Sequence, residues 1–129
     1  MNDSTKQIIE DTVNATVLKL KMAGLLKDNR KSAIEKTEEL LRNYPTFKKI
    51  TGKEHTEKLV AAVEEALGTI RNDPYFDIIN RFYFNGQSRE FIAKEYNTSV
   101  TTISRNKTRL LKEISPMLFS EEFIQELFL

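Results

Sequence analysis

The chain has 129 residues, 40% of them hydrophobic and 30% charged, which is enough apolar material for one compact domain or two small helical subdomains that share a core. It has no cysteine, and this excludes disulfides, thiolate metal sites and a thiol nucleophile. Because the first residues are polar and no apolar run approaches about 18 residues, we expect a cytoplasmic protein without a signal peptide or a membrane span.

The net charge of +1 hides an uneven distribution along the chain. Residues 81–113 contain seven Lys or Arg and three Glu, whereas residues 114–129 contain three Glu and no basic residue. A basic block beside an acidic end is typical of a nucleic-acid-binding surface. A helix face exposed to solvent explains such a small excess of basic residues equally well.

Helices are the only elements that the sequence predicts. Four Gly and three Pro interrupt the chain, and β-branched residues never alternate for long, so we predict an all-α protein. An N-terminal helical region, residues 1–72, should begin with a helix over residues 4–26. Apolar residues on one stripe of that helix are Ile8, Ile9, Val13, Val17, Leu20 and Leu25.

Pro45 is expected to divide the next helical segment. A helix over residues 32–43 should end before it, because the residue before a proline is disfavoured in the helical conformation. Thr46 can then cap a short helix that stops near Gly52. A longer helix is predicted over residues 54–71.

Asp73 and Pro74 predict the start of another helix, with Asp73 as N-cap and Pro74 at the first helical position. This helix, residues 74–84, is rich in aromatic residues. They are expected to form core, with a base-stacking platform as the alternative. The aromatic residues in question are Tyr75, Phe76, Phe82 and Tyr83.

The segment SREFIAKEYNTSVTTISRNKTRLLK, residues 88–112, has the pattern of two helices that cross through a short turn. Ala93 provides a small residue where the backbones touch, Asn97 tolerates positive φ in the turn, and Ser99 can cap the second helix. Ile103, ten residues after Ala93, opens the apolar side of that helix. We therefore predict a helix-turn-helix that docks on duplex DNA.

The start of the second helix should enter the major groove. Val100 is expected to contact a thymine methyl group and Arg105 a guanine. The full set of predicted base readers is Val100, Thr101, Thr102 and Arg105. The predicted phosphate contacts from this helix are Ser99, Ser104, Lys107, Thr108 and Arg109. Ser88 and Arg89 are expected to meet a phosphate at the start of the preceding helix.

Residues 75–114, YFDIINRFYFNGQSREFIAKEYNTSVTTISRNKTRLLKEI, resemble region four of bacterial sigma factors, in which a short aromatic helix precedes a helix-turn-helix. With KTEELLRNYPTFKKI upstream and LLKEISPMLF at the end, residues 32–119 resemble the ArpU family of phage-encoded transcriptional regulators from Gram-positive bacteria. This resemblance implies control of late phage genes through a sigma-like DNA-binding domain. The positions that match the motif are Ser88, Ile92, Ala93, Ser99, Ile103, Arg105 and Leu110.

Pro116 is expected to end the second helix, so that the DNA-binding domain covers residues 73–115 and an apolar C-terminal helix lies within residues 116–129. The apolar side chains of this last helix are too many to face water together. They are expected either to fold back on the N-terminal helices or to bury against a second copy in a homodimer. They are Phe119, Phe123, Ile124, Leu127 and Phe128.

The sequence thus predicts a sequence-specific regulator of transcription that binds double-stranded DNA, with RNA polymerase as a further partner. One alternative is a helical adaptor that binds the polymerase or a sigma factor without touching DNA; another is DNA recognition in phage packaging by a ring-like oligomer. No Gly-rich phosphate loop, paired metal ligands or nucleophile-base arrangement occurs, so we expect no enzyme, no metal and no cofactor. The single histidine, His55, is expected at the surface or in a cap.

Overall fold

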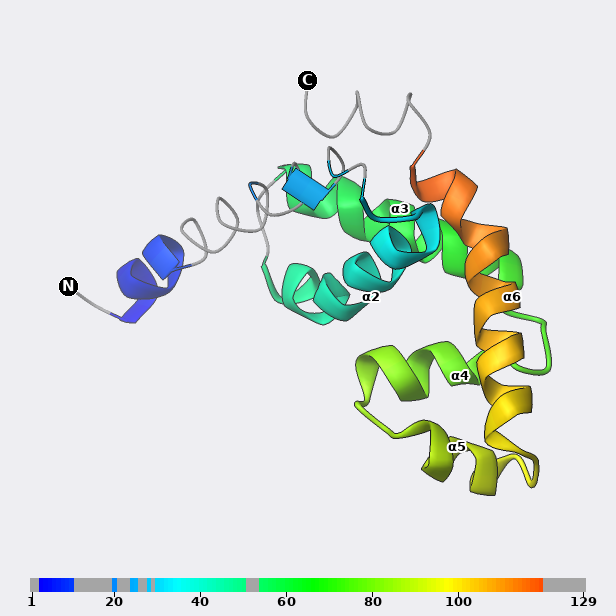
Figure 1. Cartoon of the computed structure of the whole chain (residues 1–129). Coiled ribbons are helices and arrows are strands. Elements are labelled where there is room, and N and C mark those ends of the chain that lie inside the picture. The colour runs from blue at the N-terminus through cyan, green and yellow to red at the C-terminus, as the bar shows by residue number, and fades with distance from the viewer. Residues whose placement is uncertain are drawn as a thin grey trace.

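The computed structural model describes residues 3–10, 20, 24–25, 28, 30–50 and 54–119. These residues are all-helical, as the sequence predicts. Within them, no helix has the length and apolar character needed to cross a membrane. In Figure 1, α6 runs along the right side of the view, from α5 at the bottom to α3 at the top, and so connects the two ends of the fold.

Helix α2, Ala33–Lys49, is continuous through Pro45, so the predicted break there is wrong. Proline in a helix interior costs about 3 kcal/mol, since it removes a hydrogen bond and crowds the preceding turn. Phe47 and Ile50 follow it and are 2% and 5% exposed. Burial of each large apolar side chain stabilises by about 1.5–3 kcal/mol, which outweighs the cost and keeps residues 46–49 helical.

The larger hydrophobic core joins α2, α3 (Glu54–Ile70), the end of α6 and the segment before α5. Helix α3 agrees with the predicted helix over residues 54–71 to within one residue. The side chains of this core that are least exposed include Leu40, Leu41, Val63, Ala66, Leu110, Leu111, Ile114 and Leu118.

The predicted helix over residues 74–84 forms in a modified way. Asp73 Oδ1 accepts a hydrogen bond of 2.9 Å from the backbone N–H of Tyr75. The predicted helix start is wrong, however, because the N-cap of the next helix is Phe76 and not Asp73, and Pro74 lies in the preceding turn rather than at the first helical position. After it come α4 (Asp77–Ile79) and a π-helix, η1 (Asn80–Phe84), whose last turn closes with a 3.0 Å bond from Asn85 N to Asn80 O. The sequence did not predict the wider π-turn.

The aromatic residues of this segment belong to the cores, which confirms the core interpretation. Tyr83 is buried, and Tyr75, Phe76 and Phe82 are partly buried against the hydrophobic clusters. Tyr75 also stacks on Tyr96, with ring centroids 5.6 Å apart. A base-stacking platform would need these ring faces to be open.

Helix α6, Val100–Leu118, extends through Pro116, so the expected stop at residue 115 is wrong. The reason resembles that in α2: Ile114 and Leu118, on either side of the proline, are 0% and 1% exposed. The final turn therefore belongs to the larger core, although the predicted domain boundary separates it from the rest of α6.

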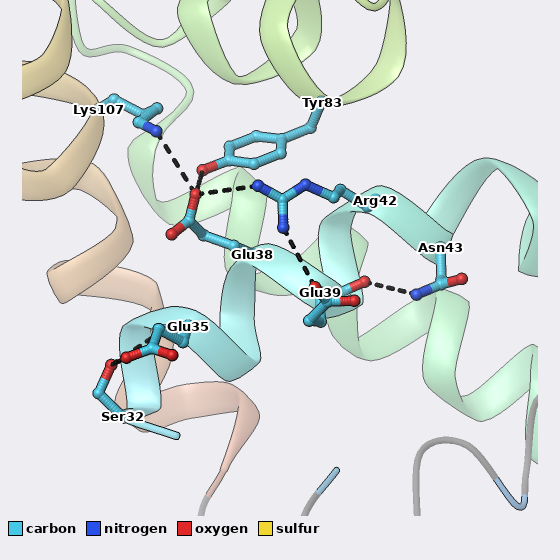
Figure 2. Close-up of polar contacts among 8 residues, drawn as sticks. All are labelled: Ser32, Glu35, Glu38, Glu39, Arg42, Asn43, Tyr83 and Lys107. Carbon is cyan, nitrogen blue, oxygen red and sulfur yellow. Dashed lines mark hydrogen bonds and ion pairs between the residues drawn. The ribbon is translucent and has the colours of Figure 1, made fainter. Parts of the chain in front are cut away.

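Glu38 of α2 joins three elements in a polar cluster (Figure 2). Its Oε2 accepts a 2.7 Å hydrogen bond from the Tyr83 hydroxyl of η1 and lies 3.4 Å from Lys107 Nζ of α6. Arg42, one turn along α2, lies 3.6 Å from the same oxygen. Burial, followed by the bond to Glu38, raises the pKa of Tyr83. The cluster therefore links α2 to η1 and α6 through polar contacts.

The N-terminal stripe is only partly described. Residues 3–10 are helical, as expected, but Ile8 and Ile9 are 65% and 47% exposed, and Leu20 is 68% exposed. Leu25 packs against the larger core. Val13, Val17, the His55 side chain and the C-terminal stretch 120–129 lie outside the described residues.

Candidate nucleic-acid interface

Helices α5 (Arg89–Glu95) and α6 are joined by a short turn whose features match the sequence prediction. Asn97 has φ of 52°, a left-handed conformation that Asn adopts more readily than most residues. Thr98 N donates a 2.9 Å bond to Ala93 O. Ser99 Oγ then accepts a 3.1 Å bond from Thr102 N and caps α6.

A small second core fixes the two helices against each other. It consists of Ile78, Ile92, Ala93 and Ile103, which are at most 4% exposed. Ala93 thus lies at the helix contact, as predicted from its size. Because Ile103 is on the inner side of α6, the opposite side of the same helix is directed to solvent.

The outer side of α6 forms one wall of a shallow groove of about 830 Å³. Thr101 and Arg105 are exposed, and Thr108 is half-buried. These residues recur at intervals of three or four, so they share one face of the helix. The complete lining is Arg89, Val100, Thr101, Ser104, Arg105, Thr108, Arg109, Lys112 and Glu113.

Four of these lining residues are basic and one is acidic. The guanidinium of Arg105 makes no hydrogen bond or ion pair with any residue that the structure describes, so it is available to a ligand. Arg89, at the start of α5, donates a 3.1 Å bond to Ser104 Oγ, which holds its side chain across the groove. Lys112 is exposed. The groove is therefore a cationic surface rather than a neutral helix face.

Arg109 is already engaged by a carboxylate. Its two terminal nitrogens donate bonds of 2.8 and 2.9 Å to the carboxylate of Asp73, and Glu113 lies 3.6 Å away. The bonds from Arg109, followed by the one from Tyr75 N, lower the pKa of Asp73. A phosphate must compete with these carboxylates for Arg109, so the predicted phosphate contact is not free.

Lys107 points away from the groove, contrary to the phosphate contact that we predicted for it. Its side chain is 13% exposed, and Nζ lies 3.4 Å from Glu38 Oε2 and 4.4 Å from the ring centroid of Phe82 (Figure 2). The physical reason is its place on α6: it follows Ile103 by four residues and precedes Leu110 by three, so it shares their inward face. Lys107 is a structural residue.

Of the remaining predicted site residues, some line the groove and others cap or stabilise the starts of the helices. Val100 is half-buried against the second core and also lines the groove. Ser88 caps α5 by accepting a 3.1 Å bond from Phe91 N. The hydroxyl of Thr102 lies 3.0 Å from that of Ser99. Ser88, Ser99 and Thr102 thus shape the helix starts.

Lys112 was missed as a candidate site residue. It lies seven residues after Arg105 and four after Thr108, a helical spacing that puts all three on one face. This signal was present in the sequence and required only that the helix be followed beyond its first two turns.

No family model, no curated protein and no solved structure matches this chain. In the part of the chain that the structure describes, no group of three or more His, Cys, Asp or Glu side chains is placed to hold a metal ion.

Proposed function

We propose that this protein binds double-stranded DNA in a sequence-specific manner and regulates transcription. The observation that carries the proposal is the unpaired Arg105 on the exposed face of α6, flanked by Arg89 and Lys112 in a groove that contains a single acidic residue. An α-helix with its side chains is about 10–12 Å wide, and the major groove of B-DNA is about 12 Å wide.

The roles within the interface follow from position. The capped start of α6 presents Thr101 and Arg105 for base edges, and Val100 for a thymine methyl group. Arg89, Thr108 and Lys112 lie around them and are suited to phosphates, which fix the register of the protein on the duplex. The bound Ser104 supports Arg89.

The wider biological setting is also a proposal. The resemblance of residues 32–119 to the ArpU family supports regulation of late phage genes in the bacterial cytoplasm, with RNA polymerase as a further partner. The apolar sequence of residues 120–129 supports a homodimer that would place two copies of α6 on a two-fold symmetric site. Light scattering of the full chain, showing a monomer or a dimer, tests that last point.

The test of DNA binding is a titration of the full chain with a fluorescent random duplex at about 50 and about 200 mM salt. Two phosphate-neutralising cations, Arg89 and Lys112, give a slope of log K against log salt of about −2, so affinity should fall about 12-fold between these conditions. Selection of bound duplexes from a random pool should then yield a preferred sequence. Binding that is absent, or indifferent to salt, would contradict the proposal.

The second candidate is an adaptor that uses the same helices to bind RNA polymerase or a sigma factor. Phe91 favours it: this side chain lies on the outer side of α5 and is 47% exposed, and aromatic residues are enriched in protein interfaces. Capture of the polymerase by the full chain, with no salt-dependent binding to DNA, would select this candidate.

A further inference from the structure

A second concave site lies between α2, α3 and the π-helix, and it shares no residue with the groove on α6. Its volume is about 420 Å³, within the range of about 300–1,000 Å³ that is usual for small-molecule sites. The residues that line it are Tyr44, Lys48, Glu64, Leu67, Arg71, Phe76, Asn80 and Phe84.

Aromatic side chains form much of the wall of this cleft. The rings of Tyr44 and Phe84 are tilted against each other, with centroids 5.0 Å apart, and Phe76 is partly buried beside them. Leu67 is 6% exposed and closes the apolar side. Such a wall favours a planar aromatic ring, which can stack or pack edge-on against it.

The π-helix contributes one polar and one aromatic side chain to the cleft. Asn80 is its first residue and Phe84 its last, and both line the cleft. Tyr83, between them, is directed instead to Glu38 of α2. Wide π-turns of this kind occur often at functional sites.

The charges in the cleft leave one cation uncompensated. Glu64 accepts a 2.8 Å bond from the Tyr44 hydroxyl, and its Oε1 lies 3.5 Å from Lys48 Nζ. Burial and the bond to Glu64 raise the pKa of Tyr44, so its hydroxyl stays protonated as a donor. Arg71 is exposed and has no hydrogen-bond or ion-pair partner for its guanidinium among the residues that the structure describes. The cleft therefore offers an aromatic wall beside a free guanidinium.

From this combination we infer that the cleft binds a small aromatic anion, with its ring against the exposed parts of the half-buried Phe76 and Phe84 and its anionic group on Arg71. Tyr44, which is 8% exposed, forms the floor behind them. The amide of Asn80 is placed to accept or donate one further hydrogen bond. An aryl carboxylate, an aryl phosphate and a nucleoside monophosphate share this chemistry. The inference does not depend on whether α6 binds DNA.

The experiment is an NMR titration of the ¹⁵N-labelled full chain with phenyl phosphate, inorganic phosphate and benzyl alcohol. Phenyl phosphate should shift the side-chain signals of Asn80 and Arg71 in a saturable manner, with a dissociation constant of about 1 mM or tighter. Inorganic phosphate and benzyl alcohol, which each supply half of the ligand, should bind at least about ten-fold more weakly. Benzoate and adenosine monophosphate are then compared, and the one that binds more tightly shows whether the natural ligand is an aryl carboxylate or a nucleoside monophosphate.

Two variants make the assignment specific. Arg71→Gln should weaken phenyl phosphate by at least about ten-fold, and Phe84→Leu should weaken it while circular dichroism shows an unchanged helix content. Lys49→Gln is the matched control, because Lys49 is an exposed cation beside Lys48 that does not line the cleft. Shifts confined to the groove on α6, full affinity in Arg71→Gln, or equal affinity for inorganic phosphate would overturn the inference.

Discussion

Lys107 Nζ lies 3.4 Å from Glu38 Oε2, across 69 positions of the chain. The two side chains are 13% and 21% exposed, so the charges are largely withdrawn from water and neither is available to an external ligand. The Tyr83 hydroxyl donates to the same oxygen at 2.7 Å. Basic residues of α6 therefore have two separate tasks, one inside the fold and one in the groove.

Lys107→Ala is expected to destabilise the fold by about 1–3 kcal/mol, because it leaves the carboxylate of Glu38 partly buried without its ammonium partner. DNA affinity at a temperature where the variant is folded should be unchanged. Urea denaturation and a DNA titration measure the two effects. Glu38→Gln combined with Lys107→Ala should lose less stability than the sum of the single changes. Unaltered stability with weaker DNA binding would show that Lys107 serves the groove after all.

Tyr83 makes stability depend on alkaline pH. Burial and the bond to Glu38 raise its pKa well above the ordinary value of 10.0. Between the ordinary pKa and the raised one, the unfolded chain has lost this proton and the folded chain has kept it. The stabilising contribution is thus complete below pH 10 and falls above it, by about 1.4 kcal/mol per pH unit. Urea denaturation from about pH 9 to about pH 11.5 gives the free energy of unfolding as a function of pH. Above about pH 10 this free energy should fall less steeply in Tyr83→Phe than in the parent, by a slope that corresponds to about one proton.

Asp73→Asn is expected to release Arg109 toward DNA. Asparagine keeps an oxygen for the N–H of Tyr75, so the turn should persist, but the bidentate ion pair is lost. Because Arg109 is 43% exposed, we expect a stability loss of only about 0.5–1 kcal/mol. Affinity for random duplex at low salt should rise about 2–5-fold, since one more cation is free. The control is Asp77→Asn, which removes a carboxylate bound to Arg81 and away from the groove; an equal gain there would point to net charge alone.

The predictable parts of the fold were those fixed by local chemistry. Asn97 and Ser99 are turn and capping residues whose roles depend on a few neighbouring backbone groups, and both act as the sequence predicts. Ser88 caps α5 in the same local way, although only a phosphate contact was predicted for it from the sequence. Pro45 and Pro116 were misjudged for the opposite reason: whether a helix continues past a proline depends on what the following residues bury, and that is a tertiary property.

The groove was predictable in outline, but its electrostatics were not. Composition and spacing put Arg105 on an open face, whereas the engagement of Arg109 by Asp73 joins residues 36 positions apart. A pair so far apart in the chain cannot be predicted from local sequence patterns. The inward position of Lys107 was different, since its place between Ile103 and Leu110 on the apolar stripe was available from the sequence and was overridden by the expectation that a lysine faces DNA.

Pro45→Ala is expected to stabilise the protein by about 2–2.6 kcal/mol. Alanine restores an N–H donor within α2 and removes the crowding of the preceding turn, and together these two changes stabilise the folded state by about 3 kcal/mol. The unfolded chain becomes more flexible without the proline, and this offsets about 0.4–1 kcal/mol of the gain. Thermal unfolding provides the measurement. Pro74→Ala is the comparison, because Pro74 lies in a turn and not within a helix, and it should give no such gain. A loss of stability in Pro45→Ala would mean that the proline ring itself packs favourably.

Arg105→Ala and Lys112→Ala separate recognition of bases from attraction to phosphates. Arg105 lies near the capped start of α6 and Lys112 two turns further on, and both line the groove. Arg105→Ala should cost about 1–3 kcal/mol on a selected sequence and relax the preference at one base pair. Lys112→Ala should weaken selected and random duplexes alike and make the salt slope shallower by about 1.

The matched control for this pair is Lys49→Ala, an exposed cation of α2 outside the groove, which should leave both affinities and the slope unchanged. Duplex titrations at several salt concentrations give all three quantities, and urea denaturation should place every variant within about 0.5 kcal/mol of the parent, because the substituted side chains are exposed. Equal losses on selected and random DNA for Arg105→Ala would remove its role as a base reader. Losses of the same size in Lys49→Ala would show that net charge, and not the groove on α6, governs binding.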